Sequence, residues 1–304
     1  MGRFGKPPLR RWLPPPSRQF CARVGRQKGS PPRPRSAPGR GGLDGGRFAP
    51  AWGADVVSSN IVGYHKINLV KGFNMIAPQF VNVGADTLTR DISTIGVLDD
   101  SMAGYDEDYF YATDMMVWDT ARQSYTYYGW AGTSPGEIDD MDELNNTWLD
   151  QSTEETDDTI NVGNGFWIKA ASAGTMTISG EVPSENQIPD GGLVINLVAG
   201  FNMVANPYPQ AVPVSTFGTL DSSMAGYDED YFYATDLMVW DTARQSYTYY
   251  GWAGTSPGDI DDMAELNNTW LDQSTEATED TIPQGAAVWI KAATAGTITF
   301  PELN

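Results

Sequence analysis

An internal repeat constrains this chain more than any other feature of the sequence. Residues 101–154 return almost letter for letter as residues 223–276. Only three of the 54 aligned pairs differ: Met115/Leu237, Glu137/Asp259 and Asp142/Ala264. A repeat of this length indicates two copies of one structural unit, and 304 residues leave room for about two ordinary domains. We therefore expect a tandem array.

The first fifty residues differ sharply from the rest of the chain in charge. They contain twelve Lys and Arg and one acid, Asp44, whereas residues 51–304 contain seven Lys and Arg and 38 acids. Because Arg, Pro and Gly dominate, residues 1–54 cannot bury enough apolar surface to offset chain entropy, and we expect a disordered tail.

Two interpretations of this basic tail are open. It is either an arm for nucleic acid or another anionic surface, or sequence translated upstream of the true start or left from a degraded export signal. We favour the second, because FAPAWGADVVSS, residues 48–59, resembles the small-residue end of a signal that lacks its apolar region.

Residue content excludes several classes of function for residues 55–304. The only cysteine, Cys21, lies in the tail and the only histidine is His65, so we expect neither a disulfide framework nor a Cys/His metal site. No apolar run reaches the ~20 residues of a membrane span. The strong negative charge argues against nucleic acid as a partner. This composition is typical of a soluble, extracytoplasmic β protein.

Alternating patterns predict short strands in both copies. Ile67 and Leu69 alternate with polar neighbours before Gly72 interrupts the run, and Gly200 has the same place in the second copy. Residues 115–119 and 124–130 are rich in β-branched and aromatic residues on either side of a short polar turn, which predicts a hairpin.

One segment of each copy has a helical pattern. Within residues 137–151, apolar side chains recur at spacings of three, three and four, at Ile138, Met141, Leu144 and Trp148. This spacing predicts one amphipathic helix of about three turns, although the Asn-Asn-Thr at 145–147 disfavours it.

These patterns together predict a mainly all-β protein. We expect two tandem copies of a small β-sandwich or barrel-like domain, each with six or seven short strands and at most one short helix. Residues 183–192 are rich in Pro, Gly and polar residues and form the natural linker. The predicted boundaries are the tail at 1–54, the first repeat at 55–185 and the second at 186–304.

The order of motifs resembles a known type of domain. GFNMIA, VWD followed by SYTYY, GFWIKA and TISGEV occur in that order in the first copy. This order resembles a domain found in pairs in poorly characterised secreted bacterial proteins, and the similarity covers about residues 55–304. The resemblance implies secretion or display at a bacterial cell surface. It implies no catalytic residues.

Acidic loops are the candidate metal ligands. Oxygen-rich side chains at this density could hold Ca²⁺, at Asp100, Asp106, Asp108, Asp228 and Asp230. The spacing does not match a known calcium loop, because Ser101 and Ala103 stand where ligands are needed. The alternative is a solvated acidic surface that keeps the protein soluble, and we expect no other cofactor.

Enzyme chemistry has little support in the sequence. Two carboxylates could act in glycoside hydrolysis, but acids are too plentiful here to mark a pair. A histidine-dependent nucleophile cannot be duplicated, since His65 is replaced by Leu193 in the second copy.

Aromatic residues are the candidate ligand contacts. Several Tyr and Trp exceed what one face of a small sheet can bury, and exposed rings among acids are typical of sugar-binding or protein-binding surfaces. These are Tyr109, Tyr111, Tyr125, Tyr128 and Trp130, with Tyr231, Tyr233, Tyr247, Tyr250 and Trp252 in the second copy. The alternative is that they complete the core of each repeat.

We therefore predict a non-enzymatic secreted or cell-surface protein with a structural, adhesive or binding role. Its expected partner is an extracellular protein or polysaccharide. The alternative function is a carbohydrate-binding module or a carbohydrate-active enzyme that uses the aromatic and acidic surface.

Overall fold

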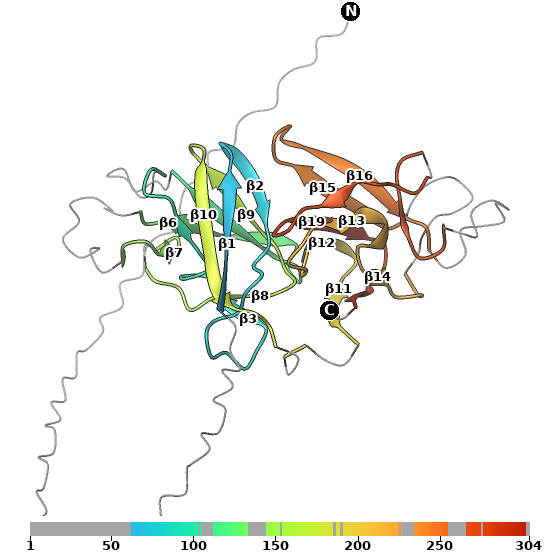
Figure 1. The fold of residues 1–304 in the computed structure, drawn as a ribbon, viewed down its shortest axis with the longest axis horizontal. Helices are drawn as coiled ribbons and strands as arrows, with labels where there is room; N and C mark the ends of the chain where they lie inside the picture. Colours follow the sequence, from blue (N-terminus) through green and yellow to red (C-terminus); the bar gives the residue numbers. More distant parts are fainter. Residues whose placement is uncertain are drawn as a thin grey trace, which may run out of the picture. The chain divides into compact units, whose positions relative to one another are not determined.

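The computed structural model describes residues 62–301, except 103, 105–111, 133–143, 153, 185–186, 189–190, 225, 227–233, 255–265 and 275. The chain divides into two units, Met1–Asp55 and Val56–Asn304, and both repeats belong to the second. Figure 1 shows the fold, with repeat 1 in blue to yellow-green and repeat 2 in yellow to red.

Repeat 1 has ten strands among the residues described. They are β1 (Val62–Leu69), β2 (Gly72–Ile76), β3 (Thr89–Asp91), β4 (Val97–Leu98), β5 (Asp114–Asp119), β6 (Ser124–Trp130), β7 (Trp148–Leu149), β8 (Thr159–Asn161), β9 (Phe166–Ala170) and β10 (Gly174–Glu181). They form antiparallel sheets in the orders β1-β10-β4, β2-β9-β5-β6-β7 and β3-β8.

Repeat 2 has the same topology. Its strands are β11 (Leu193–Leu197), β12 (Gly200–Ala205), β13 (Val212–Pro213), β14 (Thr219–Leu220), β15 (Asp236–Asp241), β16 (Ser246–Trp252), β17 (Trp270–Leu271), β18 (Thr281–Ile282), β19 (Ala287–Ala292) and β20 (Gly296–Phe300), with the 3-10 turn η2 (Val214–Thr216). The sheet orders are β11-β20-β14, β12-β19-β15-β16-β17 and β13-β18.

The core of each repeat lies between its three-stranded and its five-stranded sheet, which makes each repeat a β-sandwich. In repeat 1, Trp130 and Trp148 are buried with ring centroids 5.1 Å apart. The Trp148 Nε1 donates a hydrogen bond of 3.0 Å to the carbonyl of Gly96. Trp252 and Trp270 repeat this arrangement in the second core.

The predicted all-β fold is confirmed, and so is the hairpin, which is β5 and β6 paired from Asp114–Gly129 to Asp119–Ser124. The strand number per repeat is larger than predicted. β3, β4, β7 and β8 have only two or three residues each, and such short ladders are too brief to show an alternating pattern.

The predicted helix is wrong for the part of residues 137–151 that the structure describes. Trp148 and Leu149 form strand β7, and Asn146 has a positive φ of 59°, which ends any helix before them. Burial of Trp148 against Trp130 decides this segment, because packing outweighs a weak helical period. Residues 137–143 lie outside the described part.

Candidate functional site

The five-stranded sheets of the two repeats meet face to face through an aromatic cluster, which we call the seam. Its buried members are Met75, Ala77, Trp167, Met203, Ala205, Met238, Ala287 and Trp289, with Met116, Trp118, Tyr125, Trp240 and Tyr247 packed against them. The seam is a third apolar cluster beside the two sandwich cores, and both repeats contribute to it.

Strand alternation produces the seam. In β5, Met115 points into the core of repeat 1, whereas its neighbours Met116 and Trp118 point away from that core. These outward side chains would be exposed if repeat 1 stood alone. The same sheet face of repeat 2 covers them.

Reciprocal hydrogen bonds join the repeats at two equivalent points. The carbonyl of Phe201 accepts from Trp118 Nε1 and from Gln123 Nε2, both at 2.8 Å, and the Phe201 amide donates to Gln123 Oε1 at 2.8 Å. With the roles of the repeats exchanged, Trp240 and Gln245 make the same three bonds to Phe73 at 2.8–2.9 Å. The free edges of β2 and β12 are thus capped by the opposite repeat.

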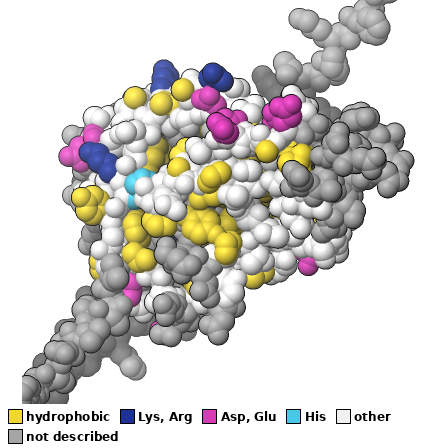
Figure 2. All heavy atoms as spheres, turned by 45° about the vertical axis from the view of Figure 1, so that its right-hand side comes forward, with side chains coloured by type: hydrophobic (Ala, Val, Ile, Leu, Met, Phe, Trp, Pro, Cys, Tyr) yellow, Lys and Arg dark blue, Asp and Glu magenta, His cyan; other side chains and the backbone are white. Residues whose placement is uncertain are grey.

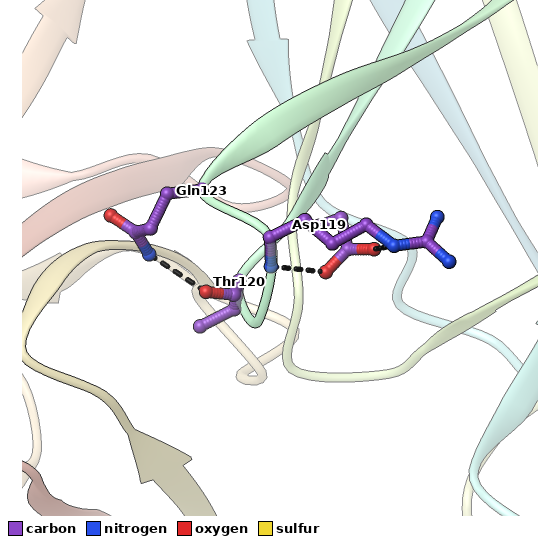
Figure 3. A network of polar contacts seen from close by, with 4 residues as sticks. Asp119, Thr120 and Gln123 are labelled. Carbon is purple, nitrogen blue, oxygen red and sulfur yellow. Dashed lines mark hydrogen bonds and ion pairs between the residues drawn. The ribbon is translucent and has the colours of Figure 1, made fainter.

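A tight turn positions each bridging glutamine (Figure 3). Asp119 accepts from the Arg122 amide at 2.9 Å and forms an ion pair with its guanidinium at 3.4 Å. Gln123, with φ of 51°, donates to the carbonyl of Thr120 at 2.7 Å, which directs its side chain toward repeat 2. Gly200 receives it, since a Cβ there would lie 2.5 Å from Gln123 Oε1.

Tryptophan pairs cross the seam with matching geometry. Trp118 meets Trp289 edge to face at 5.1 Å and 88°, and Trp167 meets Trp240 at the same distance and angle. Edge-to-face aromatic pairs add stability beyond the area that they bury. The contact is therefore isologous, like the interface of a two-fold symmetric dimer, although both halves belong to one chain.

Backbone bonds continue the seam beyond the aromatic cluster. The Ala77 amide donates to the carbonyl of Gly285 at 2.9 Å, and the Ala205 amide donates to that of Gly163 at 2.7 Å. His65 lies at this end of the seam, where a Cβ on Gly285 would lie 2.5 Å from its ring. Burial lowers the pKa of His65, partly offset by the Gln79 side chain. The His65 side chain is half-buried.

The structure divides the predicted ligand contacts into three groups. Tyr128, Trp130, Tyr250 and Trp252 are at most 4% exposed and complete the sandwich cores, which was the alternative interpretation and corrects the expectation of a surface role. Tyr125 and Tyr247 are half-buried in the seam. Tyr109, Tyr111, Tyr231 and Tyr233 lie outside the described residues.

Hydrogen bonds confirm the structural role of these tyrosines. The Tyr128 hydroxyl donates to Asp158 at 2.7 Å, and burial together with this carboxylate raises the pKa of Tyr128. The Tyr125 hydroxyl accepts from Trp167 Nε1 at 3.2 Å. Burial in the seam raises the pKa of Tyr247 to about 12. These groups stay protonated near neutral pH and serve packing.

The proposed calcium ligands gain no support from the residues that can be described. Asp100 is exposed, and the other four, Asp106, Asp108, Asp228 and Asp230, lie outside the described part. Within that part, no three His, Cys, Asp or Glu side chains gather closely enough to hold a metal ion.

A small mixed face lies beside the seam on each five-stranded sheet. We call the set Phe73, Lys169, Asp114 and Tyr127 the repeat-1 face, and the set Phe201, Lys291, Asp236 and Tyr249 the repeat-2 face. Lys169 pairs in register with both Phe73 and Asp114, and its Nζ lies 3.9 Å from the Asp114 carboxylate. Figure 2 shows that hydrophobic side chains reach the surface in groups, with acidic side chains near some of them.

Sequence reasoning missed Tyr127 and Tyr249 as candidate contacts. Tyr127 is 44% exposed and Tyr249 is 45% exposed, whereas the neighbouring Tyr128 is 4% exposed. The period of two contained the signal, because Tyr125 and Tyr127 share a face that Tyr128 cannot share. Grouping Tyr125 with Tyr128 ignored that alternation.

Burial raises the pKa of Asp114 and of Asp236, and the neighbouring Lys169 and Lys291 offset the shift only in part. A carboxyl group whose pKa is raised by folding stabilises the fold below its unfolded pKa, and that contribution is lost as pH rises through the folded pKa. The variant Asp114→Asn has no carboxyl group to ionise at this position, so it does not lose stability in this way as pH rises. We expect its stability relative to wild type to increase between pH ~3 and pH ~7, where a carboxyl group ionises.

Urea unfolding at the two pH values measures this difference. Asp100→Asn, at an exposed position, is the control. The double variant Asp114→Asn/Asp236→Asn should show a larger increase in relative stability than Asp114→Asn alone. A difference from wild type that is equal at both pH values, or smaller at pH ~7, would contradict the assignment.

Comparisons with protein-family models, with curated proteins and with solved structures gave no match. In the described part of the chain, no helix has the length and apolar character needed to cross a membrane.

Proposed function

We propose that this chain is a non-enzymatic β-repeat protein, secreted or displayed at a bacterial cell surface, with a structural, adhesive or binding role. The observation that carries the proposal is the reciprocal seam. Trp118 and Gln123 hold Phe201 as Trp240 and Gln245 hold Phe73, so two copies of one sheet surface stand in a fixed relation.

Rigid duplication favours binding over catalysis. Two linked sites can raise avidity by a factor of about 10²–10⁴ on a ligand that spans both, whereas a second active site only doubles the rate. Side chains that enzymes often place in clefts are here used for packing: Tyr128 in the core, and Tyr125 and Trp167 in the seam.

An open hollow on repeat 1 does not change this interpretation. It is lined by Val62, Val83, Arg90 and Asp91, among others. The Arg90 guanidinium donates to the carbonyls of Val81 and Thr94 at 3.2 and 2.7 Å, which gives it a structural role. In repeat 2 the position of Arg90 is occupied by Val212. Arg90 pairs with Ile160 in repeat 1, and Val212 pairs with Ile282 in repeat 2.

The competing function is a carbohydrate-active enzyme. The observation that favours a saccharide is the exposed Tyr127 and Tyr249, each on the strand next to an Asp that pairs in register with a Lys. A single carboxylate on each face offers no second acid for hydrolysis within the described residues.

Immobilised polymers test the proposal. The full chain is passed over surfaces of neutral and acidic polysaccharides and of extracellular matrix proteins, and product release from the same polymers is assayed in parallel. We expect saturable binding to at least one polymer without release of product. Release above the level of heat-unfolded protein, abolished by Asp114→Asn/Asp236→Asn, would show an enzyme instead, and binding to no polymer would also contradict the proposal.

A further inference from the structure

We propose that the repeat-1 face and the repeat-2 face are two equivalent binding sites for a neutral saccharide. This inference rests on the proposed binding function and assigns it a ligand class and residues. It differs from the earlier aromatic prediction, because Tyr128 and Tyr250 are buried in the sandwich cores and Tyr125 and Tyr247 are half-buried in the seam.

Position along the strands places these residues at the surface beside the seam. Phe73 lies two residues from Met75 in β2, and Tyr127 lies two residues from Tyr125 in β6. Lys169 lies two residues from Trp167 in β9, and Asp114 lies two residues from Met116 in β5. A shift of two residues keeps a side chain on the same sheet face, so all four extend the seam outward.

Exposure of the aromatic rings distinguishes these faces from the rest of the sheet. Phe73 and Phe201 are each 39% exposed and Tyr127 and Tyr249 are 44% and 45% exposed, whereas Trp167 and Trp289 behind them are at most 5% exposed. Asp114 in β5 pairs with Gly129 in β6, so no side chain of β6 lies directly beside the carboxylate. Tyr127 lies diagonally across the two strands from Asp114.

The seam holds the rings in place before any ligand arrives. The Phe73 backbone is bonded on both its amide and carbonyl by Gln245 of repeat 2, and its ring lies edge to face on Trp167 at 5.9 Å. Tyr127 lies against Tyr125 at 6.2 Å. Preorganised contacts reduce the entropy lost on binding.

The chemistry of the faces fits a neutral sugar. A tyrosine ring offers an apolar surface with a polar edge, which suits the C–H face and the hydroxyls of a pyranose ring. The Asp114 carboxylate accepts hydrogen bonds from hydroxyls, and the Lys169 ammonium donates them. Asp114 and Lys169 together carry no net charge, and the 38 acids of residues 51–304 repel polyanions.

The residues of the two faces are the same in both repeats. Outside the nearly identical segment, the buried Ile76 is replaced by Val204 and the buried Phe166 by Val288. The exposed Phe73 and Lys169 are unchanged as Phe201 and Lys291. The buried Met75 and Trp167 are also unchanged, as Met203 and Trp289, so each face and the seam residues behind it are the same in both repeats.

Calorimetric titration of the full chain with soluble oligosaccharides tests the sites. The probes are cello-, malto-, laminari-, xylo-, manno- and N-acetylchito-oligosaccharides, which are all uncharged. For at least one of them we expect two equivalent sites per chain. Tyr127→Ala and Tyr249→Ala should each leave one site, and the double variant should bind about tenfold or more weakly at both. Tyr127→Phe/Tyr249→Phe keeps both rings and should keep both sites.

Controls separate loss of a site from loss of the fold. Tyr64→Ala removes a ring that is 76% exposed on β1, away from both faces, and should bind like wild type. Thermal unfolding of each variant checks that the repeats remain folded, and the retained site of each single variant is an internal check.

Three results would overturn the inference. They are failure of every oligosaccharide to bind, unchanged binding by the double variant, and binding of matrix proteins alone. The last leaves the proposed binding function intact and removes only the saccharide. Product release from polymers would instead contradict the proposed function.

Discussion

Gly165→Ala is expected to lower the free energy of unfolding by about 1–3 kcal/mol, the range for overpacking a filled interior. Gly165 and Ala287 occupy equivalent positions in the two repeats and face each other across the seam. A Cβ on Gly165 would overlap that of Ala287 and would lie 3.1 Å from Met203 Cγ. The seam has room for one methyl group at this point.

The exchange variant Gly165→Ala/Ala287→Gly provides a sharp control. It keeps one methyl group between the repeats and only moves it to the other strand, so its stability should lie within about 1 kcal/mol of wild type. Urea unfolding of the two single variants and the double variant forms a cycle with a favourable coupling energy. An exchange variant that is as unstable as Gly165→Ala would show that the repeats do not meet at these residues.

Trp148→Ala is expected to cost about 3–5 kcal/mol, the range for removing a fully buried large aromatic side chain. Trp148 is 0% exposed, packs on Trp130 at 5.1 Å and satisfies the carbonyl of Gly96. Its loss leaves a cavity and a buried acceptor without its donor. Trp270→Ala should cost a similar amount, because Trp270 makes the equivalent bond of 3.0 Å to the carbonyl of Phe217.

Tyr127→Ala is the matched control for this pair, since it also truncates an aromatic side chain but at an exposed position. Its cost should stay below about 1 kcal/mol. Chemical denaturation followed by tryptophan fluorescence and by circular dichroism measures all three variants. Equal losses for Trp148→Ala and Tyr127→Ala would contradict the assignment of Trp148 to the core.

Tandem organisation, an all-β fold and the β5–β6 hairpin could be predicted from local signals. The repeat is evident from the identity of the two segments in the amino-acid sequence. The positions of Tyr125, Tyr127 and Tyr128 indicate a strand and the sheet face of each side chain, because successive side chains in a strand point to opposite sides. Gly72 and Gly200 also marked real bends, with φ of 103° and 108°. Weak patterns were less informative: the helical spacing that ends at Trp148 predicted a helix, but Trp148 lies in strand β7.

The candidate site depended on information that the sequence does not contain. The alternation of side chains along a strand assigns Trp118, Tyr125 and Tyr127 to the sheet face that points away from the core of their own repeat. It cannot show whether that face is covered by the second repeat or by solvent. Tertiary packing makes that distinction: Trp289 covers Trp118 and Tyr125, and the seam ends before Tyr127. The sequence by itself determined the unit, its duplication and the faces of its strands. Only the tertiary structure decided which outward aromatics join the repeats and which reach solvent, because contacts between sheets depend on the relative placement of residues far apart in the chain.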